Sequence, residues 1–191
     1  MSWITDTLQG NGTLINKLNI TNAHRLFVAE SRISQVRYQE IINHPINIKD
    51  IESLKVIHYR LFGAIYSWAG KFRTGNFHKN STEFFPVSRF NYAIEDLNTQ
   101  ISHFNRQSYH STETQLYDLA QLLLDINMFH PFREGNGRTQ RLFITLIAEQ
   151  NGITLHLKKS SPAYDSYMQA AVSDDLEMMV EALTKSIAND S

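Results

Sequence analysis

One short stretch of the sequence concentrates side chains that could carry out chemistry. Residues 130 to 141 read His-Pro-Phe-Arg-Glu-Gly-Asn-Gly-Arg-Thr-Gln-Arg. Gly135, Asn136 and Gly137 stand directly before an apolar pattern with helical spacing, so we expect them at a helix amino terminus. Glycines there let the backbone approach a ligand and turn amide groups toward it, while the helix dipole favours negative charge. The pattern predicts an anion-binding loop.

The charged residues of the same stretch indicate which anion it would bind. Arg138 and Arg141 are three residues apart, so they share one helix face and offer two fork-shaped donors to phosphate oxygens. Glu134 would repel a bare phosphate chain, but its carboxylate suits a Mg²⁺ ion that bridges phosphates. His130 is the side chain best able to accept a proton near neutral pH. These residues favour a polyphosphate, Mg²⁺ and a histidine general base.

Each of these features alone has an ordinary structural explanation. A histidine before a proline is usually a loop residue, Gly-Asn-Gly is usually a turn, and paired arginines usually form a solvated helix face. Their combination within one stretch of the chain favours catalysis over those explanations.

Apolar residues at helical spacing predict the elements that position the loop. The expected helices cover 21–42, starting at Thr21 or Asn22, then 47–66, 88–104, 112–129, a helix from the loop to Asn151-Gly152, one opened by Ser161-Pro162, and a last one over about 174–190. Thr112 and Gln115 form an expected capping box. Pro131 should push His130 out of the α region, so that His130 lies at a helix exit.

The stretch from 69 to 86 breaks the helical period with Gly70, Gly75, Asn80 and Pro86, which predicts a β-hairpin or irregular flap at about 70–87. No repeat or linker interrupts the chain. We therefore predict an all-α fold, a single domain over 1–191 with about seven to eight helices and a small hairpin flap.

Composition narrows the class of protein. The chain has 191 residues, 42% of them hydrophobic, and a formal charge of -1, which gives no electrostatic footprint for nucleic acid. It contains no cysteine, so disulfides and thiolate metal sites are excluded. No apolar run is long enough to span a bilayer and the amino terminus lacks a signal-peptide pattern. We expect a soluble, cytoplasmic protein that binds neither membrane nor nucleic acid directly.

Residues 130 to 141 resemble the signature of the Fic (filamentation induced by cAMP) family, His-x-Phe-x-Glu-Gly-Asn-Gly-Arg-x-x-Arg, without a departure. Residues 57–62 (Ile-His-Tyr-Arg-Leu-Phe) and 66–73 (Tyr-Ser-Trp-Ala-Gly-Lys-Phe-Arg) also resemble the helix and flap entry of Fic domains. The likeness covers about residues 15–175.

The resemblance implies a protein adenylyltransferase, in which a Tyr, Thr or Ser hydroxyl of a target protein attacks the α-phosphorus of ATP. It implies these roles: His130 as base, Glu134 for Mg²⁺, Gly135, Asn136 and Gly137 for the α- and β-phosphates, Arg138 for the leaving group and Arg141 for the γ-phosphate. Phe132 would anchor the loop. Tyr164 and Tyr167 either border the adenine or belong to the core.

In the family the flap pairs with an extended segment of the target. The resemblance places the target-docking residues here at Lys71, Phe72, Arg73, Thr74, Gly75 and Asn76. The aromatic residues Phe77, Phe84 and Phe85 are assigned either to the core or to the surface of the flap, and the remaining histidines are interpreted as structural.

Fic enzymes are commonly restrained by a helix with the pattern Ser/Thr-x-x-x-Glu-Gly/Asn. The nearest segments here, 173–178 and 186–191, both depart from it. Residues 14–21 and 29–33 look more like Fic toxins whose inhibitory glutamate comes from a separate small antitoxin, and such toxins modify type II topoisomerase subunits among other targets. We therefore expect an antitoxin partner.

Two other functions are compatible with parts of this pattern. Relatives with altered motifs transfer phosphate or phosphocholine, whereas the intact Gly-Asn-Gly-Arg-x-x-Arg favours AMP. A nucleotide-binding interaction module is the second alternative, but a pure binder has no need of His130.

Overall fold

The computed structural model describes residues 3–79 and 82–187. That part of the chain folds into seven α-helices, two short 3-10 helices and one two-stranded hairpin. The α-helices are α1 (Ala23–Asn43), α2 (Glu52–Phe62), α3 (Phe90–Arg106), α4 (Thr112–Phe129), α5 (Asn136–Gln150), α6 (Tyr164–Ser173) and α7 (Leu176–Ser186). The predicted all-α class is confirmed. None of the described helices is long and apolar enough to cross a membrane.

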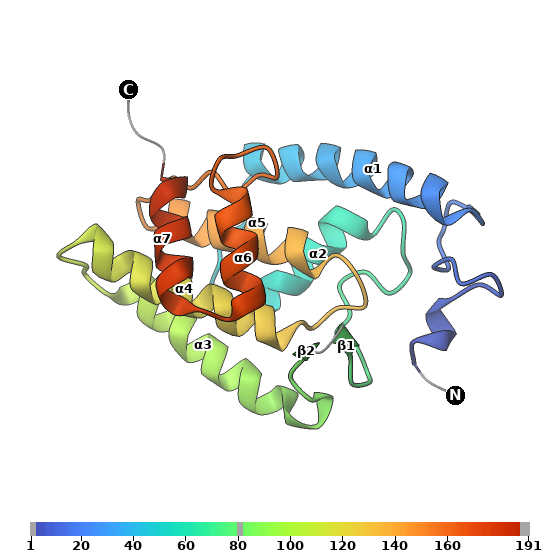
Figure 1. Ribbon diagram of the computed structural model, residues 1–191, viewed down its shortest axis with the longest axis horizontal. Helices are drawn as coiled ribbons and strands as arrows, with labels where there is room; N and C mark the ends of the chain where they lie inside the picture. Colours follow the sequence, from blue (N-terminus) through green and yellow to red (C-terminus); the bar gives the residue numbers. More distant parts are fainter. Residues whose placement is uncertain (1–2, 80–81, 188–191) are drawn as a thin grey trace.

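Helix α5 is the centre of the molecule. It packs between α2 and α4, while α1 covers α2, α3 lies along α4, and the pair α6 and α7 rests on α4 (Figure 1). The predicted apolar faces lie in the core: Leu119, Leu123 and Ile126 of α4 and Phe143 and Ile147 of α5 are at most 1% exposed. The loop that joins these two buried helices is the one that carries the motif.

Helix caps explain several of the boundaries. The side chain of Asn22 accepts a hydrogen bond from the Arg25 amide, so the expected cap of α1 is confirmed. Helix α4 is capped by Ser111 instead of the predicted box of Thr112 and Gln115, because Ser111 Oγ accepts from the Thr114 amide and the Gln115 side chain donates to the carbonyl of Asn151.

Helix α2 is shorter than the predicted 47–66, because side chains from other helices hold the backbone before it. Ile48 N–H donates to Gln150 Oε1 and Ile51 N–H donates to Asn98 Oδ1. The chain before Glu52 therefore satisfies its amide groups through long-range contacts instead of an extra helical turn.

The carboxyl-terminal helices also differ from the expectation. Ser161 does not cap a helix through its side chain, and α6 begins at Tyr164. Asp174 takes a left-handed conformation (φ 52°) that separates α6 from α7, so residues 173–178 do not form one inhibitory helix. The predicted last helix, 174–190, is observed as Leu176–Ser186, and residues 188–191 lie outside the described part.

The predicted flap contains a short antiparallel hairpin, β1 (His78–Lys79) and β2 (Thr82–Glu83), with His78 opposite Glu83. Residues 80–81 lie outside the described part of the chain. Figure 1 shows the hairpin close to the loop between α4 and α5.

The position of the α4 cap leads to a first prediction. Ser111→Ala should lower the free energy of unfolding by about 1 kcal/mol, since one amide of the first turn loses its acceptor. Thr112→Ala is the matched control and should change stability by no more than about 0.5 kcal/mol, because Thr112 already lies inside the helix. Urea unfolding of both variants measures the difference, and a larger loss in Thr112→Ala would contradict the assignment.

Candidate active site

A pair of reciprocal hydrogen bonds shapes the loop between α4 and α5. The Asn136 side chain accepts from the Phe132 amide and donates to the Phe132 carbonyl, both at 2.8 Å. Asn136 is 5% exposed and Phe132 is 1% exposed, so these bonds form in a dry environment where they are strong. The side chain of Asn136 therefore fixes the loop between α4 and α5, residues 130–135, from within.

Gly135 begins α5 in a conformation that favours glycine. Its φ is 80°, and a Cβ atom there would lie 2.5 Å from the ring of Phe62. The Gly135 carbonyl accepts from the Thr139 amide and hydroxyl. The amides of Asn136, Gly137 and Arg138 belong to the first turn of α5, which has no intrahelical acceptors for them. Amides of this kind at a positive helix end can bind an anion.

His58 of α2 supports the loop from below. Its Nδ1 accepts from the Gly70 amide at 2.8 Å, which puts the ring proton on Nε2, and Nε2 donates to the Glu134 carbonyl at 2.9 Å. The ring also stacks on Phe132 at 3.9 Å between centroids. Burial lowers the pKa of His58 to about 4, so the ring is neutral near pH 7. His58 was predicted to be structural, and its role is to link the Gly70 amide to the Glu134 carbonyl of the motif loop.

His130 ends α4 in the left-handed region, with φ 41°. The expected exit from the helix at this residue is confirmed. Its Nδ1 lies 3.3 Å from the Asn127 carbonyl, and a carbonyl can only accept, so the Nδ1 proton points there. In the neutral ring Nε2 then carries the lone pair that a general base needs. Phe84 of the flap stacks on the His130 ring at 3.7 Å, and Phe77 lies 5.8 Å away.

Arg73 connects the flap with the backbone of His130. Its guanidinium donates to the carbonyls of His130 (2.9 Å), Gly75 (2.8 Å) and Phe85, and it packs over the ring of Phe90. Arg73 is 4% exposed and its guanidinium is used by these backbone carbonyls, while its predicted contact with a target stays a prediction. Burial lowers the pKa of Arg73 to about 10, which leaves it charged at neutral pH.

The other predicted docking residues, Lys71, Phe72, Thr74, Gly75 and Asn76, form the segment that leads into the hairpin and lie outside its strands. Lys71, Thr74 and Asn76 are exposed, whereas Phe72 packs against Phe90 and Phe129. Among the described residues the strands of the hairpin cover 78–79 and 82–83, so the predicted docking residues precede the hairpin, and their contact with a target stays a prediction.

The amino-terminal segment covers part of this leading segment. The Trp3 indole donates to the carbonyl of Asn76 at 3.1 Å, and a Cβ atom on Gly75 would overlap the Trp3 ring. Arg133 of the motif loop donates to Thr7 Oγ1 at 2.8 Å and packs over the Trp3 ring. These contacts join the amino terminus, the flap and the motif loop.

The two arginines of the motif lie in different surroundings. Arg138 pairs with the buried carboxylate of Glu30 and donates to Ser34 Oγ at 3.1 Å. Arg141 lies over the rings of Tyr164 (5.2 Å) and Tyr167 (5.6 Å) and, among the described residues, forms no ion pair with a carboxylate. Tyr167 was predicted either to border the adenine or to belong to the core. It is 1% exposed and therefore belongs to the core.

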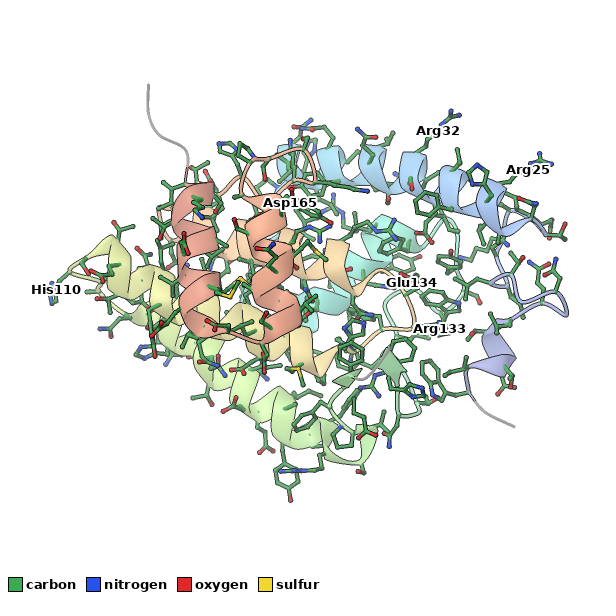
Figure 2. All side chains as sticks on the ribbon, in the orientation of Figure 1. Arg25, Arg32, His110, Arg133, Glu134 and Asp165 are labelled. Carbon is green, nitrogen blue, oxygen red and sulfur yellow. The ribbon has the colours of Figure 1, made fainter. Side chains whose placement is uncertain are left out.

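Glu134 is exposed on the loop next to the amino terminus of α5, where Figure 2 labels it beside Arg133. One of its oxygens accepts from the Gly135 amide at 3.0 Å. The described residues contain no cluster of three metal-ligating side chains. A single carboxylate beside a phosphate-binding turn nevertheless fits Mg²⁺, because this ion commonly takes one or two carboxylates and completes its shell with phosphates and water.

Sequence reasoning missed several residues of this arrangement. The stacking of Phe84 on His130, the pairing of Glu30 with Arg138 and the orientation of His130 by Asn127 all come from contacts distant in sequence or from a backbone carbonyl. The only available signal was the acidic Glu30 on an otherwise amphipathic helix, and charged residues on helices are usually solvated.

The sequence profile of the Fic/DOC family matches residues 48–148, more than half of the chain, and this range contains His130, the first turn of α5 and both arginines of the motif. The chain belongs to the Fic/DOC family. Protein adenylyltransferase VbhT of Bartonella schoenbuchensis is 34% identical over 146 residues, which are 74% of this Fic/DOC chain and 30% of VbhT. The chain therefore spans about a third of that relative. A probable protein adenylyltransferase Fic of Escherichia coli is 26% identical over 91% of this chain and 86% of its own.

Solved Fic domains share the fold of this Fic/DOC chain. The amino-terminal Fic domain of a Bartonella effector protein from Bartonella sp. AR 15-3 superposes with a TM-score of 0.88 at 22% identity, over 98% of this chain and 93% of that one. BepC of Bartonella tribocorum, solved with bound AMPPNP, gives a TM-score of 0.83 at 18% identity over 98% of both chains. At such identities the likeness establishes the fold.

The conformation of Gly135 generates a second prediction. Gly135→Ala should lower the free energy of unfolding by at least about 2 kcal/mol, since alanine disfavours a positive φ and its Cβ meets the Phe62 ring. Gly152→Ala, with a similar φ of 84° and open space around it, separates the two causes. Equal losses in both variants would show that the Phe62 contact adds nothing.

The low pKa of His58 generates a third prediction. The unfolded chain binds a proton at this residue below about pH 6.5, whereas the folded chain does so only near pH 4. The contribution of His58 is therefore fully present at pH 7 and falls by about 3 kcal/mol as the pH drops from 6.5 to 4. Denaturant unfolding across this range should show a smaller pH slope in His58→Gln. An unchanged slope would contradict the prediction.

Proposed function

We propose that this protein is an adenylyltransferase that moves AMP from ATP to a hydroxyl group of a target protein. The observation that carries the proposal is the joint placement of His130, with Nδ1 held by a carbonyl, and the anion-binding first turn of α5 on one loop. The relatives named as protein adenylyltransferases support AMP as the transferred group.

The nucleotide would bind with its phosphates on the amides of Gly135 to Arg138. The α- and β-phosphates would face these amides, Arg138 would contact the leaving group and Arg141 the γ-phosphate. Support for ATP comes from BepC, whose structure contains AMPPNP. Glu134 would hold Mg²⁺, which, when bound, neutralises charge on the phosphates.

The reaction requires one proton transfer and one substitution at phosphorus. His130 Nε2 accepts the proton of the target hydroxyl while the oxygen attacks the α-phosphorus. The new oxygen–phosphorus bond replaces the bond to the leaving pyrophosphate, which departs toward the arginines. The amides of the α5 turn stabilise the charge that develops on the phosphoryl oxygens, and the fixed loop supplies the alignment.

The target would dock as an extended segment along the hairpin. Strands β1 and β2 pair only with each other among the described residues, so an outer edge remains for strand addition. Phe84 and Phe77 beside His130 would contact the side chain that carries the hydroxyl. On this proposal, the specificity for the target would lie next to the base.

An antitoxin partner is also proposed. Arg141 lies against tyrosine rings without a carboxylate partner among the described residues, so its charge is available both to a phosphate and to a competing glutamate from another chain. Residues 173–178 do not supply that glutamate from a continuous helix.

The experiment for AMP transfer is a fourth prediction. The purified protein is incubated with Mg²⁺, a cell lysate and ATP labelled on either the α- or the γ-phosphate. We expect label from the α-phosphate on protein bands and its loss in His130→Ala. Label only from the γ-phosphate would indicate phosphate transfer, and nucleotide binding without label would favour the interaction module.

The matched control is His110→Ala. His110 is exposed at the left end of the view in Figure 2, far from Glu134, which is labelled right of the centre. This variant should label target bands as the unchanged protein does. Loss of label in both histidine variants would remove the assignment of His130 as the base.

A further inference from the structure

The side chain of Arg138 is held in place by a buried carboxylate from another helix. Glu30 of α1 accepts from Arg138 Nη2 with one oxygen and from the Tyr66 hydroxyl with the other. Glu30 is 5% exposed and Tyr66 is 1% exposed. Both oxygens of the carboxylate are therefore used inside the protein.

Two further contacts fix the guanidinium. Arg138 Nη1 donates to Ser34 Oγ at 3.1 Å, and Ser34 in turn donates to the Ser31 carbonyl at 3.2 Å. The guanidinium also lies 4.7 Å from the centre of the Phe62 ring. Phe62 is the ring that closely faces Gly135, so the same side chain bounds the anion-binding turn and supports its arginine.

An arginine side chain normally loses considerable freedom when it binds a phosphate, because its long stem must be ordered. Here that ordering has already occurred in the folded protein. The contacts with Glu30 and Ser34 use one N–H on each terminal nitrogen, which leaves the remaining N–H groups of the guanidinium for a ligand. The Arg138 side chain is 31% exposed, so these groups are accessible.

Burial makes the arrangement depend on every member. A buried carboxylate is stable only when it is paired and hydrogen-bonded, and the removal of one partner leaves an uncompensated group. Burial, followed by the hydrogen bond to Glu30, raises the pKa of Tyr66, which keeps the hydroxyl protonated as a donor. Tyr66 is therefore the donor in this contact near neutral pH.

We infer that Glu30, oriented by Tyr66, is a positioning residue that presets Arg138 for the phosphates beyond the α-phosphate of the nucleotide. The inference rests on the proposed function for the identity of the nucleotide. Helix α1 would thereby support the nucleotide site through Glu30 without touching the nucleotide. The segment after α2 would support it through Tyr66. Arg141, in contrast, forms no ion pair with a carboxylate of the described residues and would meet the nucleotide from its place over the Tyr164 ring.

The test compares the affinities of the protein for ATP and for AMP by calorimetry, because only ATP carries the phosphates that Arg138 would contact. Glu30→Gln should weaken ATP binding about tenfold, the loss expected when one charge-assisted hydrogen bond is misaligned. AMP binding should change by less than about twofold. Glu40→Gln, which removes an exposed carboxylate paired with Arg37 on the same helix, is the matched control and should change neither affinity.

A double-mutant cycle separates positioning from a general loss of structure. In the background of Arg138→Ala, Glu30→Gln should have no further effect on ATP affinity, since the group that it positions is absent. Equal losses for ATP and AMP, additive effects in the cycle, or an unchanged ATP affinity would each overturn the inference.

Tyr66→Phe provides a second route if Glu30→Gln does not fold. It keeps the ion pair and removes only the hydroxyl that orients Glu30, so ATP affinity should again fall while AMP affinity is retained. If ATP affinity does not fall in this variant, the inference is overturned. The affinity measurements do not depend on AMP transfer. A protein that binds ATP but does not label targets would therefore refute the proposed function alone. If the protein without substitutions does not bind ATP, both the proposed function and the inference about Glu30 are refuted.

Discussion

The pairing of the Asn136 side chain with the backbone of Phe132 is the interaction on which the rest of the site depends. It bends the chain between Phe132 and Asn136, so that only residues 130–135 separate the helix that ends at Phe129 from the one that begins at Asn136. Without this pairing the buried N–H and C=O groups of Phe132 would need other partners, and the orientation of α5 relative to α4 would no longer be set. His130 and the first turn of α5 are close because they lie at the two ends of this short connection.

Around this loop the protein uses buried side chains that hydrogen-bond to the backbone. His58 and Arg73 both donate to backbone carbonyls of the motif loop, at Glu134 and His130. Such bonds are strong in a low-dielectric interior and costly to break, so the loop is stiff although it has no regular structure. The shape of the loop therefore depends on distant parts of the chain. His58 and Arg73 come from different segments, and each segment must fold correctly for the loop to take its shape.

The sequence predicts the loop and its neighbouring helices well because their physics is local. A proline at 131 forces the helix exit at His130, and apolar residues at helical spacing in α4 and α5 lie in the core as expected. The start of α2 could not be predicted, because its preceding amides are satisfied by Gln150 and Asn98 from distant helices. The burial of Glu30 and Arg73 could not be predicted for the same reason. Nothing in the sequence around these two residues distinguishes them from charged residues on the surface.

The packing of Trp3 on Gly75 and Asn76 connects the amino-terminal segment to the flap. Trp3 holds the carbonyl of Asn76 and fills the space above Gly75, and the neighbouring Thr7 is bonded to Arg133 of the motif loop. A force or a binding event that lifted this segment would release the flap and one side of the motif loop together. The amino-terminal segment therefore holds the flap and the motif loop together. A molecule that binds this segment would alter the access of a target to His130 from outside the site.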